Sequence, residues 1–234
     1  MKDIKIQMKG ITKSFETADM ETQALRGVDL TIYDGDYVSI AGPSGCGKST
    51  LLTILGLLDQ PSSGTYAIEG TDVSQLSLTD AAAIRCEKIG FIFQQFNLID
   101  ELSVFENIAL PLRYQRNPLS DEQIKQRVMS CLEKVEMTHR SGHKPNQLSG
   151  GQQQRIAIAR ALVAEPAILL VDEPTGNLDS KNGDAVMEML STLNNEGTTI
   201  CLVTHDPRYA NMATTRLHLL DGKIVEHDTL QEAV

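Results

Sequence analysis

Apolar and polar positions follow two different periods along this 234-residue chain, and the change of period separates strands from helices. Short apolar runs between turn residues predict strands, whereas apolar positions at helical intervals predict helices. Strands are expected as short pieces with turns within residues 1–35 (segments 4–11 and 28–32, then a DGD turn), at 37–41, around 65–70, at 90–93, 167–171 and 199–203, with a hairpin at 217–227. Helices are expected at 48–58, over most of 100–165 (segments 103–112, 120–137 and 148–162) and near 181–194.

Strands and helices alternate except in the middle of the chain, where the pattern is all helical. This order predicts an α/β fold in a single domain over residues 1–234. Its core comprises approximately residues 1–95 and 165–234, and a helical lobe of approximately residues 96–164 is inserted into it.

The charge and the cysteines exclude several classes of function. A formal net charge of −10 argues against binding to nucleic acid or directly to an anionic membrane. The cysteines form no C-x-x-C pair, so neither a zinc site nor a disulfide framework is expected for Cys46, Cys86, Cys131 and Cys201. The N-terminus lacks the apolar core of a signal peptide, and no apolar run approaches about 18 residues. A cytoplasmic protein is therefore expected, and any membrane it works at must be supplied by another chain.

The strand at 37–41 runs into GPSGCGKST, which matches the pattern G-x-x-x-x-G-K-[ST] between a strand and a helix. In that setting backbone N–H groups and the positive end of the helix dipole converge on phosphate oxygens. Lys48 would reach the β- and γ-phosphates, and Ser49 would bind Mg²⁺. Cys46 has no evident phosphate role. The nucleotide-binding candidates here are Gly42, Pro43, Ser44, Gly45, Cys46, Gly47, Lys48, Ser49 and Thr50.

Polar residues follow three other predicted strands, where ligands of an open parallel sheet bind. The carboxylate of Asp172 is suited to holding Mg²⁺, mostly through water. Glu173 could polarise the water that attacks the γ-phosphate, and its alternative is an exposed charge at a strand end. His205 in a THDP turn is more often a capping residue than a catalyst, and Gln94 could merely satisfy a loop. Both are kept as candidates for the site because they share a position at the sheet edge.

The segment LSGGQQQRIAIARAL, residues 148–162, is a helix with a weak start. Ser149 and Gln152 have the spacing of a capping box. Gly150 and Gly151 nevertheless occupy the first helical positions, where each Gly costs roughly 1 kcal/mol relative to Ala. A helix start weakened in this way is an anion-binding candidate.

Taken together, these motifs resemble the ATP-binding subunits of ABC transporters over essentially the whole chain. The resemblance is carried, in the family's order, by GPSGCGKST, the Gln-loop FIFQQFNL, the signature LSGGQ, the run ILLVDEP, the D-loop NLD and the His-loop THD. It implies a P-loop NTPase of the ABC type: a mixed sheet core with an N-terminal antiparallel β subdomain and an inserted helical lobe. It also implies ATP hydrolysis to ADP and phosphate, with ATP and Mg²⁺ as cofactors.

The resemblance assigns roles to further residues. Phe15 matches the aromatic residue that stacks on adenine, although many family members have Tyr there. Gln94, or its neighbour Gln95, matches the residue that contacts Mg²⁺ and senses the membrane partner. His205 matches the switch that contacts the γ-phosphate, and Asp179 matches the residue that links the two sites of a dimer. The signature residues would bind the ATP held by the facing subunit: Ser149, Gly150, Gly151 and Gln152.

Segments 89–112 and 148–162 are most similar to the subgroup of macrolide and antimicrobial-peptide exporters and the lipoprotein-releasing complex. The expected protein is a motor that forms a dimer, as a homodimer in the ATP state, around two ATP molecules. It would drive a separate integral membrane permease from the cytoplasmic face. The alternative is a soluble ABC-type ATPase in iron–sulfur assembly or DNA maintenance. A chromosome-type head is disfavoured because the space between Gln94 and Leu148 is too short for a coiled-coil insertion.

Overall fold

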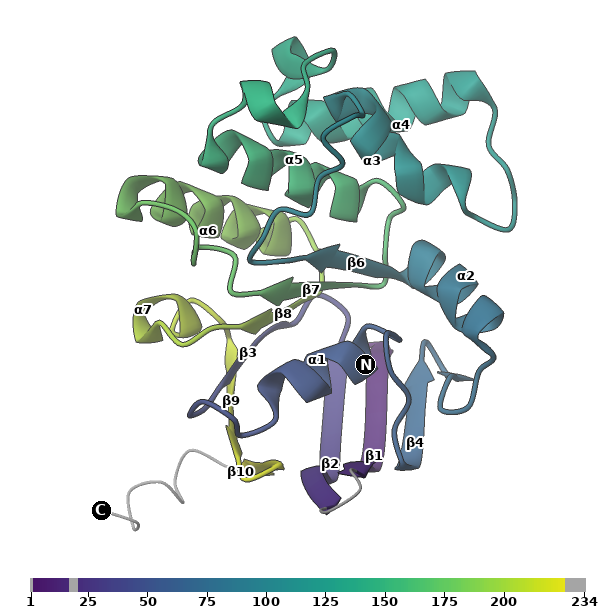
Figure 1. Cartoon of the computed structure of the whole chain (residues 1–234), viewed down its shortest axis with the longest axis vertical. Helices are drawn as coiled ribbons and strands as arrows, with labels where there is room; N and C mark the ends of the chain where they lie inside the picture. The colour runs from purple at the N-terminus through teal and green to yellow at the C-terminus, as the bar shows by residue number, and fades with distance from the viewer. Residues whose placement is uncertain (1, 17–20, 226–234) are drawn as a thin grey trace.

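The computed structural model describes residues 2–16 and 21–225, and it contains two sheets with helices packed around them (Figure 1). The 4-stranded antiparallel sheet has the order β2-β1-β4-β5 and comprises β1 (Ile4–Glu16), β2 (Glu21–Tyr33), β4 (Ser63–Ile68) and β5 (Thr71–Asp72). The 6-stranded sheet has the order β10-β9-β3-β8-β7-β6. Its strands are β3 (Tyr37–Ala41), β6 (Ile89–Ile92), β7 (Ile168–Asp172), β8 (Ile200–Val203), β9 (Thr215–Leu220) and β10 (Lys223–Val225).

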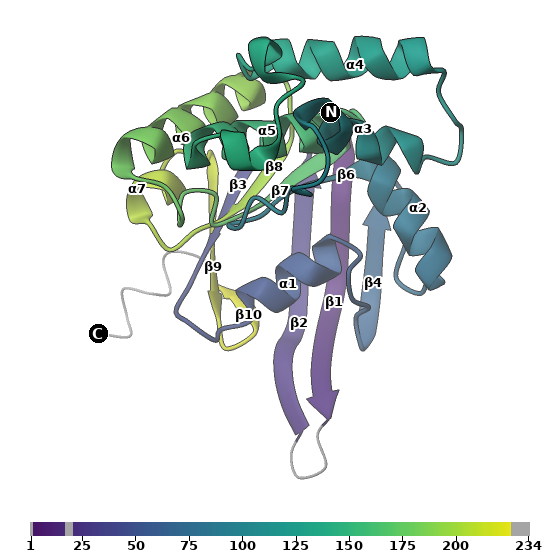
Figure 2. The same cartoon turned by 45° about the horizontal axis from the view of Figure 1, so that its top comes forward.

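The prediction of short strands within residues 1–35 is wrong, because β1 and β2 are each 13 residues long and form one ribbon (Figure 2). The register of their pairing shifts between Met8 and Ile11 and again between Lys13 and Ser14. Met8 and Ile11 are both buried although they are three residues apart, so the alternation of apolar and polar residues is interrupted within a continuous strand.

All neighbouring strands from β9 to β6 are parallel, and only β10 runs antiparallel, to β9. The carboxyl ends of β3, β6, β7 and β8 therefore meet at one edge of the sheet. The hairpin expected at 217–227 is present as β9 and β10, although Glu226 and His227 lie outside the described residues.

The helices are α1 (Lys48–Leu55), α2 (Leu78–Lys88), α3 (Val104–Arg113), α4 (Asp121–Lys134), α5 (Gly150–Leu162), α6 (Ser180–Asn195) and α7 (Pro207–Ala210). Single 3₁₀ turns cover Thr138–Arg140 and Pro145–Gln147. Helix α1 ends three residues before the expected boundary, since Leu57 has a φ of 52° and cannot continue a helix. Helices α3, α4 and α5 lie together at the top of Figure 1.

Helix α2 was not predicted, and the reason is its surroundings. None of its residues is buried, so the segment carries no apolar stripe of helical period. Its start was nevertheless encoded, because the Ser77 hydroxyl accepts a hydrogen bond from the Asp80 N–H as an N-cap.

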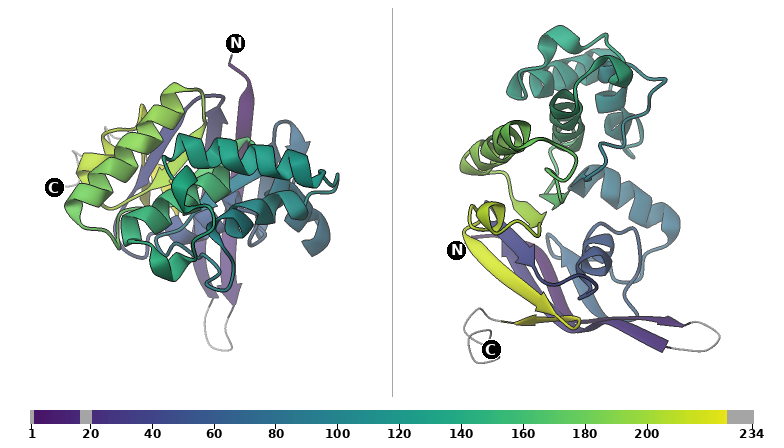
Figure 3. Two further views of the ribbon diagram at one scale, coloured as in Figure 1. Left: turned by 90° about the horizontal axis from the view of Figure 1, so that it is seen from above. Right: turned by 60° about the vertical axis from the view of Figure 1, so that its left-hand side comes forward.

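Two apolar clusters form the core. One contains Leu51, Leu52, Ile54 and Leu55 of α1 together with buried residues of both sheets, so that α1 lies between the sheets (Figure 3). The other joins one face of β6–β8 to α3, α4, α5 and α6. The first cluster fixes the phosphate loop before α1, and the second fixes the start of α5.

Candidate nucleotide-binding site

The phosphate loop connects β3 to α1 and ends at Gly47, which precedes the first helical residue with a φ of 107°. No side chain caps this helix, and its first intrahelical bond runs from the Leu51 N–H to the Gly47 carbonyl. The N–H groups of Lys48, Ser49 and Thr50 consequently have no partner within the helix. A helix start of this kind, with its positive dipole end, binds anions.

The loop has little room at its two ends. A Cβ at Gly42 would lie 2.2 Å from the Leu219 carbonyl oxygen, and one at Gly47 would lie 2.6 Å from the Ala24 carbonyl oxygen. The C-terminal hairpin also braces the loop, since the Gly222 N–H donates to the Cys46 carbonyl at 3.0 Å. Glycine is therefore required at both positions for the backbone to pack this closely.

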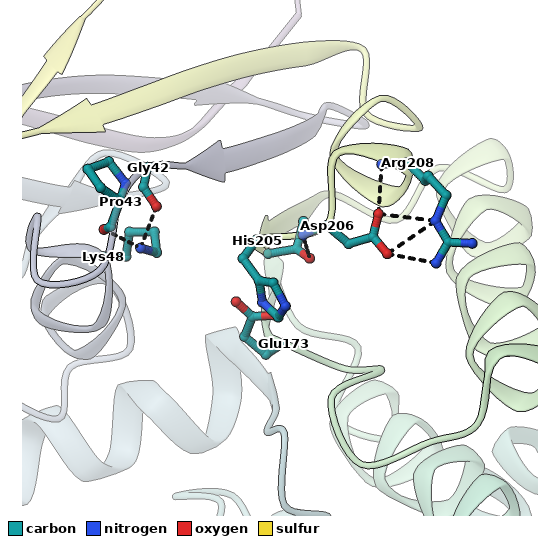
Figure 4. A network of polar contacts seen from close by, with 8 residues as sticks. Gly42, Pro43, Lys48, Glu173, His205, Asp206 and Arg208 are labelled. Atoms are coloured by element: carbon teal, nitrogen blue, oxygen red, sulfur yellow. Dashed lines mark hydrogen bonds and ion pairs between the residues drawn. The ribbon is translucent and has the colours of Figure 1, made fainter.

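Lys48 lies across its own loop (Figure 4). Its Nζ donates to the carbonyl oxygens of Gly42 and Pro43, each at 2.8 Å. The Sγ of the buried Cys46 lies 3.9 Å from the same nitrogen. The ammonium group is thus held where the loop curves around it, as a phosphate-binding lysine requires.

Asp172 ends β7 beside this loop. Burial raises the pKa of its carboxyl, the neighbouring charge of Glu173 raises it further, and the ammonium of Lys48 lowers it. These three groups therefore interact electrostatically at one sheet edge. A hard divalent cation prefers oxygen ligands, and here it would stabilise the ionised form of a carboxylate that burial disfavours. Ser49 and Asp172 supply such oxygens, so the residues present fit Mg²⁺.

Glu173 has a backbone φ of 46°, a left-handed conformation that is unusual for a residue with a side chain. Its N–H donates to the Val203 carbonyl of β8 at 3.0 Å, and its own carbonyl accepts from the Gly176 N–H at 3.1 Å. These bonds hold the residue in its strained conformation and turn the chain away from the sheet. Strain of this kind is concentrated at functional positions.

His205 lies against Glu173 in Figure 4, and its Nδ1 is 2.7 Å from the Glu173 Oε2. The His205 side chain is 77% exposed, whereas that of Glu173 is only 17% exposed. The turn before α7 presents the imidazole, because the Asp206 N–H donates to the buried Thr204 hydroxyl. Asp206 then caps α7 and pairs with Arg208, which lowers the pKa of the Asp206 carboxyl.

Gln94 follows β6 and contacts the segment after Glu173. A Cβ at Gly176 would lie 2.5 Å from the Gln94 Nε2, and the Asn177 side chain donates to the Gln94 carbonyl at 3.0 Å. Gln94 and Gln95 are both exposed. Of the two, Gln94 is the residue that contacts the segment after Glu173.

The start of α5 is the expected capping box. The Ser149 hydroxyl accepts from the Gln152 N–H at 3.4 Å, and the Ser149 N–H donates to the Gln152 Oε1 at 3.0 Å. Gly151 is buried, and a Cβ there would lie 2.6 Å from the Asn182 Oδ1 of α6. A bulky residue at Gly151 would therefore displace Asn182, because this glycine makes room for Asn182 within its own chain.

Asp179 and Phe15 have identifiable local roles. Asp179 caps α6, and its bond to the Asn182 backbone N–H lowers the pKa of its carboxyl. Phe15, on β1, is 45% exposed and has the Lys13 Nζ 5.2 Å from its ring centroid. Within the described part of the chain, Phe15 and residues 149–152 form no hydrogen bond with Lys48, Asp172, Glu173 or His205.

Sequence reasoning missed Asn182 and Gln154, which tie this region together. Asn182 bridges Asp179 and Gly151, and Gln154 donates to the Pro174 carbonyl from a buried position. A polar residue on the apolar face of the 150–162 helix was the available signal for Gln154.

A phosphate loop, a strand-end carboxylate pair, a histidine and a second glycine-rich helix start define a P-loop ATPase with an inserted helical region. The family model described as "ABC transporter" matches residues 25–176. The chain belongs to this family, and it is an ATPase with the ABC fold.

The similarity to individual relatives extends over nearly the whole chain. It is 46% identical to the uncharacterized ABC transporter ATP-binding protein MJ0796 of Methanocaldococcus jannaschii, covering 97% of both chains. It is 46% identical to a macrolide export ATP-binding/permease protein MacB of Bdellovibrio bacteriovorus over 97% of this chain, but spans only 34% of that protein. A dimeric structure of MJ0796 in a post-hydrolysis state with ADP and Pi has a TM-score of 0.84 at 44% identity, covering 94% of this chain and 97% of that one.

Proposed function

We propose that this chain is the motor subunit of an ABC transporter, which binds Mg-ATP, dimerises around two ATP molecules and drives a separate membrane permease. The exporter subgroup is favoured by the similarity to macrolide export proteins. The chain would act as one ATP-binding domain, with a core of about residues 1–95 and 165–234 and a helical subdomain of about residues 96–164. Its place would be the cytoplasmic face of the cell membrane, on the permease.

One observation carries the hydrolytic part of the proposal: Lys48, Asp172, Glu173 and His205 converge at one sheet edge. The loop N–H groups and Lys48 would bind the phosphates, while Ser49, Asp172 and Gln94 would hold Mg²⁺. The bound ion would neutralise charge on the β- and γ-phosphates. Glu173 would orient the attacking water and accept its proton. His205, hydrogen-bonded to Glu173, would fix that carboxylate and contact the γ-phosphate.

The signature supports a dimer in the ATP state. Ser149 is exposed at the start of α5, in a second helix terminus suited to phosphate, and it takes no part in the hydrogen bonds around Lys48. Residues 149–152 would therefore bind the ATP of a facing subunit, and Asp179 would lie at the same interface. Phe15 would stack on adenine.

A groove of about 310 Å³ supports the permease as partner. It continues from the Gln-loop at Asn97 and is lined by apolar side chains, including Phe91, Phe93 and Leu110. The rings of Phe91 and Phe93 stack with centroids 4.2 Å apart, and Tyr114 at the rim is 71% exposed. Among the residues that the structure describes, no helix could span a membrane. A cytoplasmic segment of the permease would fill the groove and act on Gln94 through the adjoining loop.

The test is purification of the tagged chain from membranes. The proposal expects an integral membrane protein to co-purify, and Tyr114→Ser to reduce its recovery about tenfold, as expected for the loss of an interface aromatic. ATP hydrolysis by the isolated chain should be unchanged by this substitution. Persistent recovery of a soluble partner instead would favour the alternative, an ABC-type ATPase of iron–sulfur assembly or DNA maintenance.

A further inference from the structure

Gln154 is a buried amide on helix α5 for which the proposed mechanism has no role. Its side chain is fully buried, beside apolar residues of the same helix such as Ile156 and Ile158. Its Nε2 donates to the Pro174 carbonyl at 3.0 Å, whereas its Oε1 has no hydrogen-bond partner. A half-satisfied buried amide opposes folding, so its presence calls for an explanation other than stability.

The accepting carbonyl belongs to the residue immediately after Glu173. The N–H of Glu173 donates to β8, and its carbonyl accepts from the Gly176 N–H. The next peptide group of this strained turn is the one that carries the Pro174 carbonyl. The bond from Gln154 holds that peptide. The position of the Glu173 carboxylate therefore depends on helix α5.

The same helix begins with the signature. Gln154 lies three residues after Gly151 and four after Gly150, which places all three on one face of α5. Gly151 packs on Asn182, and Asn182 donates to Asp179. One helical turn thus separates the residues proposed to bind the facing subunit's ATP from the residue that holds the turn after the chain's own Glu173.

We infer that Gln154 is a positioning residue, which transmits the engagement of the signature at one ATP site to the catalytic glutamate of the other site. The inference rests on the proposed ATP-bound dimer. A displacement of α5 when Ser149 and the glycines bind phosphate moves the Pro174 carbonyl and, with it, Glu173. Hydrolysis at the two sites is coupled by this route.

Gln154→Met tests the coupling, because it keeps the length of the side chain and replaces the amide with an apolar thioether. The variant should stay folded, with a melting temperature within about 4 °C of the parent. Its turnover should fall about tenfold and its Hill coefficient for ATP should fall to about 1, as expected for loss of a coupling between sites. In a Glu173→Gln background it should still form the ATP dimer, since the signature itself is intact.

Gln153→Met is the matched control, one residue away on the same helix. The Gln153 amide donates to the Leu148 carbonyl and makes no bond to the turn after Glu173. It should keep the parent's turnover and Hill coefficient. Parental turnover and cooperativity in Gln154→Met would overturn the coupling alone. Absence of any ATP dimer in Glu173→Gln with Gln154 present would overturn the proposed dimer as well.

If Gln154→Met does not fold, hydrogen exchange tests the same coupling without a change at Gln154. The Gly176 amide, bonded to the Glu173 carbonyl, reports on the turn. In Glu173→Gln with Mg-ATP its exchange should slow on dimer formation. In Ser149→Arg/Glu173→Gln, which should bind ATP as a monomer, no such slowing is expected. Equal protection in both would overturn the inference.

Discussion

At the scale of single residues, the site is built from groups held in unfavourable states. Glu173 has a left-handed backbone, and Asp172 is a carboxylate whose ionisation is opposed by burial and by its neighbour. Neither feature stabilises the fold by itself. In the proposed mechanism bound nucleotide and cation would compensate for both, so substitutions here should separate stability from activity.

Asp172→Asn should stabilise the nucleotide-free protein at neutral pH. Because the pKa of Asp172 is raised in the folded state, the contribution of this group to stability is fully present below its unfolded pKa of about 4 and is lost as pH rises through the folded pKa. The melting temperature at pH 7 should rise by about 2–4 °C, and the gain should disappear near pH 3. Calorimetry checks this, and the stabilisation of the parent by Mg-ATP should be absent from the variant. A lower melting temperature at pH 7 would refute the assignment.

Lys48→Ala should weaken nucleotide binding itself. A hydrogen bond to a charged group contributes about 1.5–3 kcal/mol, which corresponds to an affinity loss of about 10- to 150-fold. Titration with a fluorescent ATP analogue measures it. Lys125→Ala, on the exposed face of α4, is the control and should bind as the parent does. Parental affinity in Lys48→Ala would remove this lysine from the phosphate site.

At the scale of elements, the helix starts differ in how they are capped, and the proposed phosphate sites lie at two of them. Helix α1 begins without a side-chain cap, and α5 begins with a capping box on two glycines. Helices α3 and α4 have similar Ser boxes without the glycines. Of the two glycines of α5, Gly151 allows Asn182 to pack closely against the helix. Ser149, which precedes them, is exposed and accessible to a partner.

Ser149→Arg should abolish the ATP-dependent dimer while leaving ATP binding to the monomer intact. Loss of the cap costs about 0.5–2 kcal/mol of stability, and the bulky charge blocks the exposed helix start. Ser120→Arg is the matched control, since Ser120 caps α4 with Gln123 in the same type of box. Light scattering with Mg-ATP in a Glu173→Gln background should give a monomer for the first variant and a dimer for the second. If the Ser149→Arg variant still formed the dimer, LSGGQ would have only a structural role, as a helix cap.

Much of this arrangement could be predicted from the sequence, and what was missed has physical causes. The phosphate loop, the capping box of α5 and the strands leading to Asp172 and His205 are encoded by local patterns, so they were predictable. Helix α2 was not, because none of its side chains is buried. The contacts of Gly151 with Asn182 and of Gln154 with Pro174 join separate segments, and no local pattern specifies such partners.

At the scale of the whole molecule, the proposed ATP site would be completed only by a second chain. The phosphate loop and the carboxylates lie together at one sheet edge, while the start of α5, the proposed second anion site, belongs to the helices of the other apolar cluster. The groove between α2, β6 and α3 lies on the same chain and continues into the Gln-loop. This layout fits a protein whose work depends on a second copy and a membrane partner.

Glu173→Gln tests the central claim most directly. The amide keeps the size of the side chain and removes the carboxylate proposed to accept the proton of the attacking water, so turnover should fall about 100-fold or more while ATP binding persists. With Mg-ATP, size-exclusion chromatography with light scattering should then show a stable dimer of about twice the 25.7 kDa chain mass. A chain that remains monomeric with Mg-ATP and hydrolyses it at the parent's rate would contradict the account.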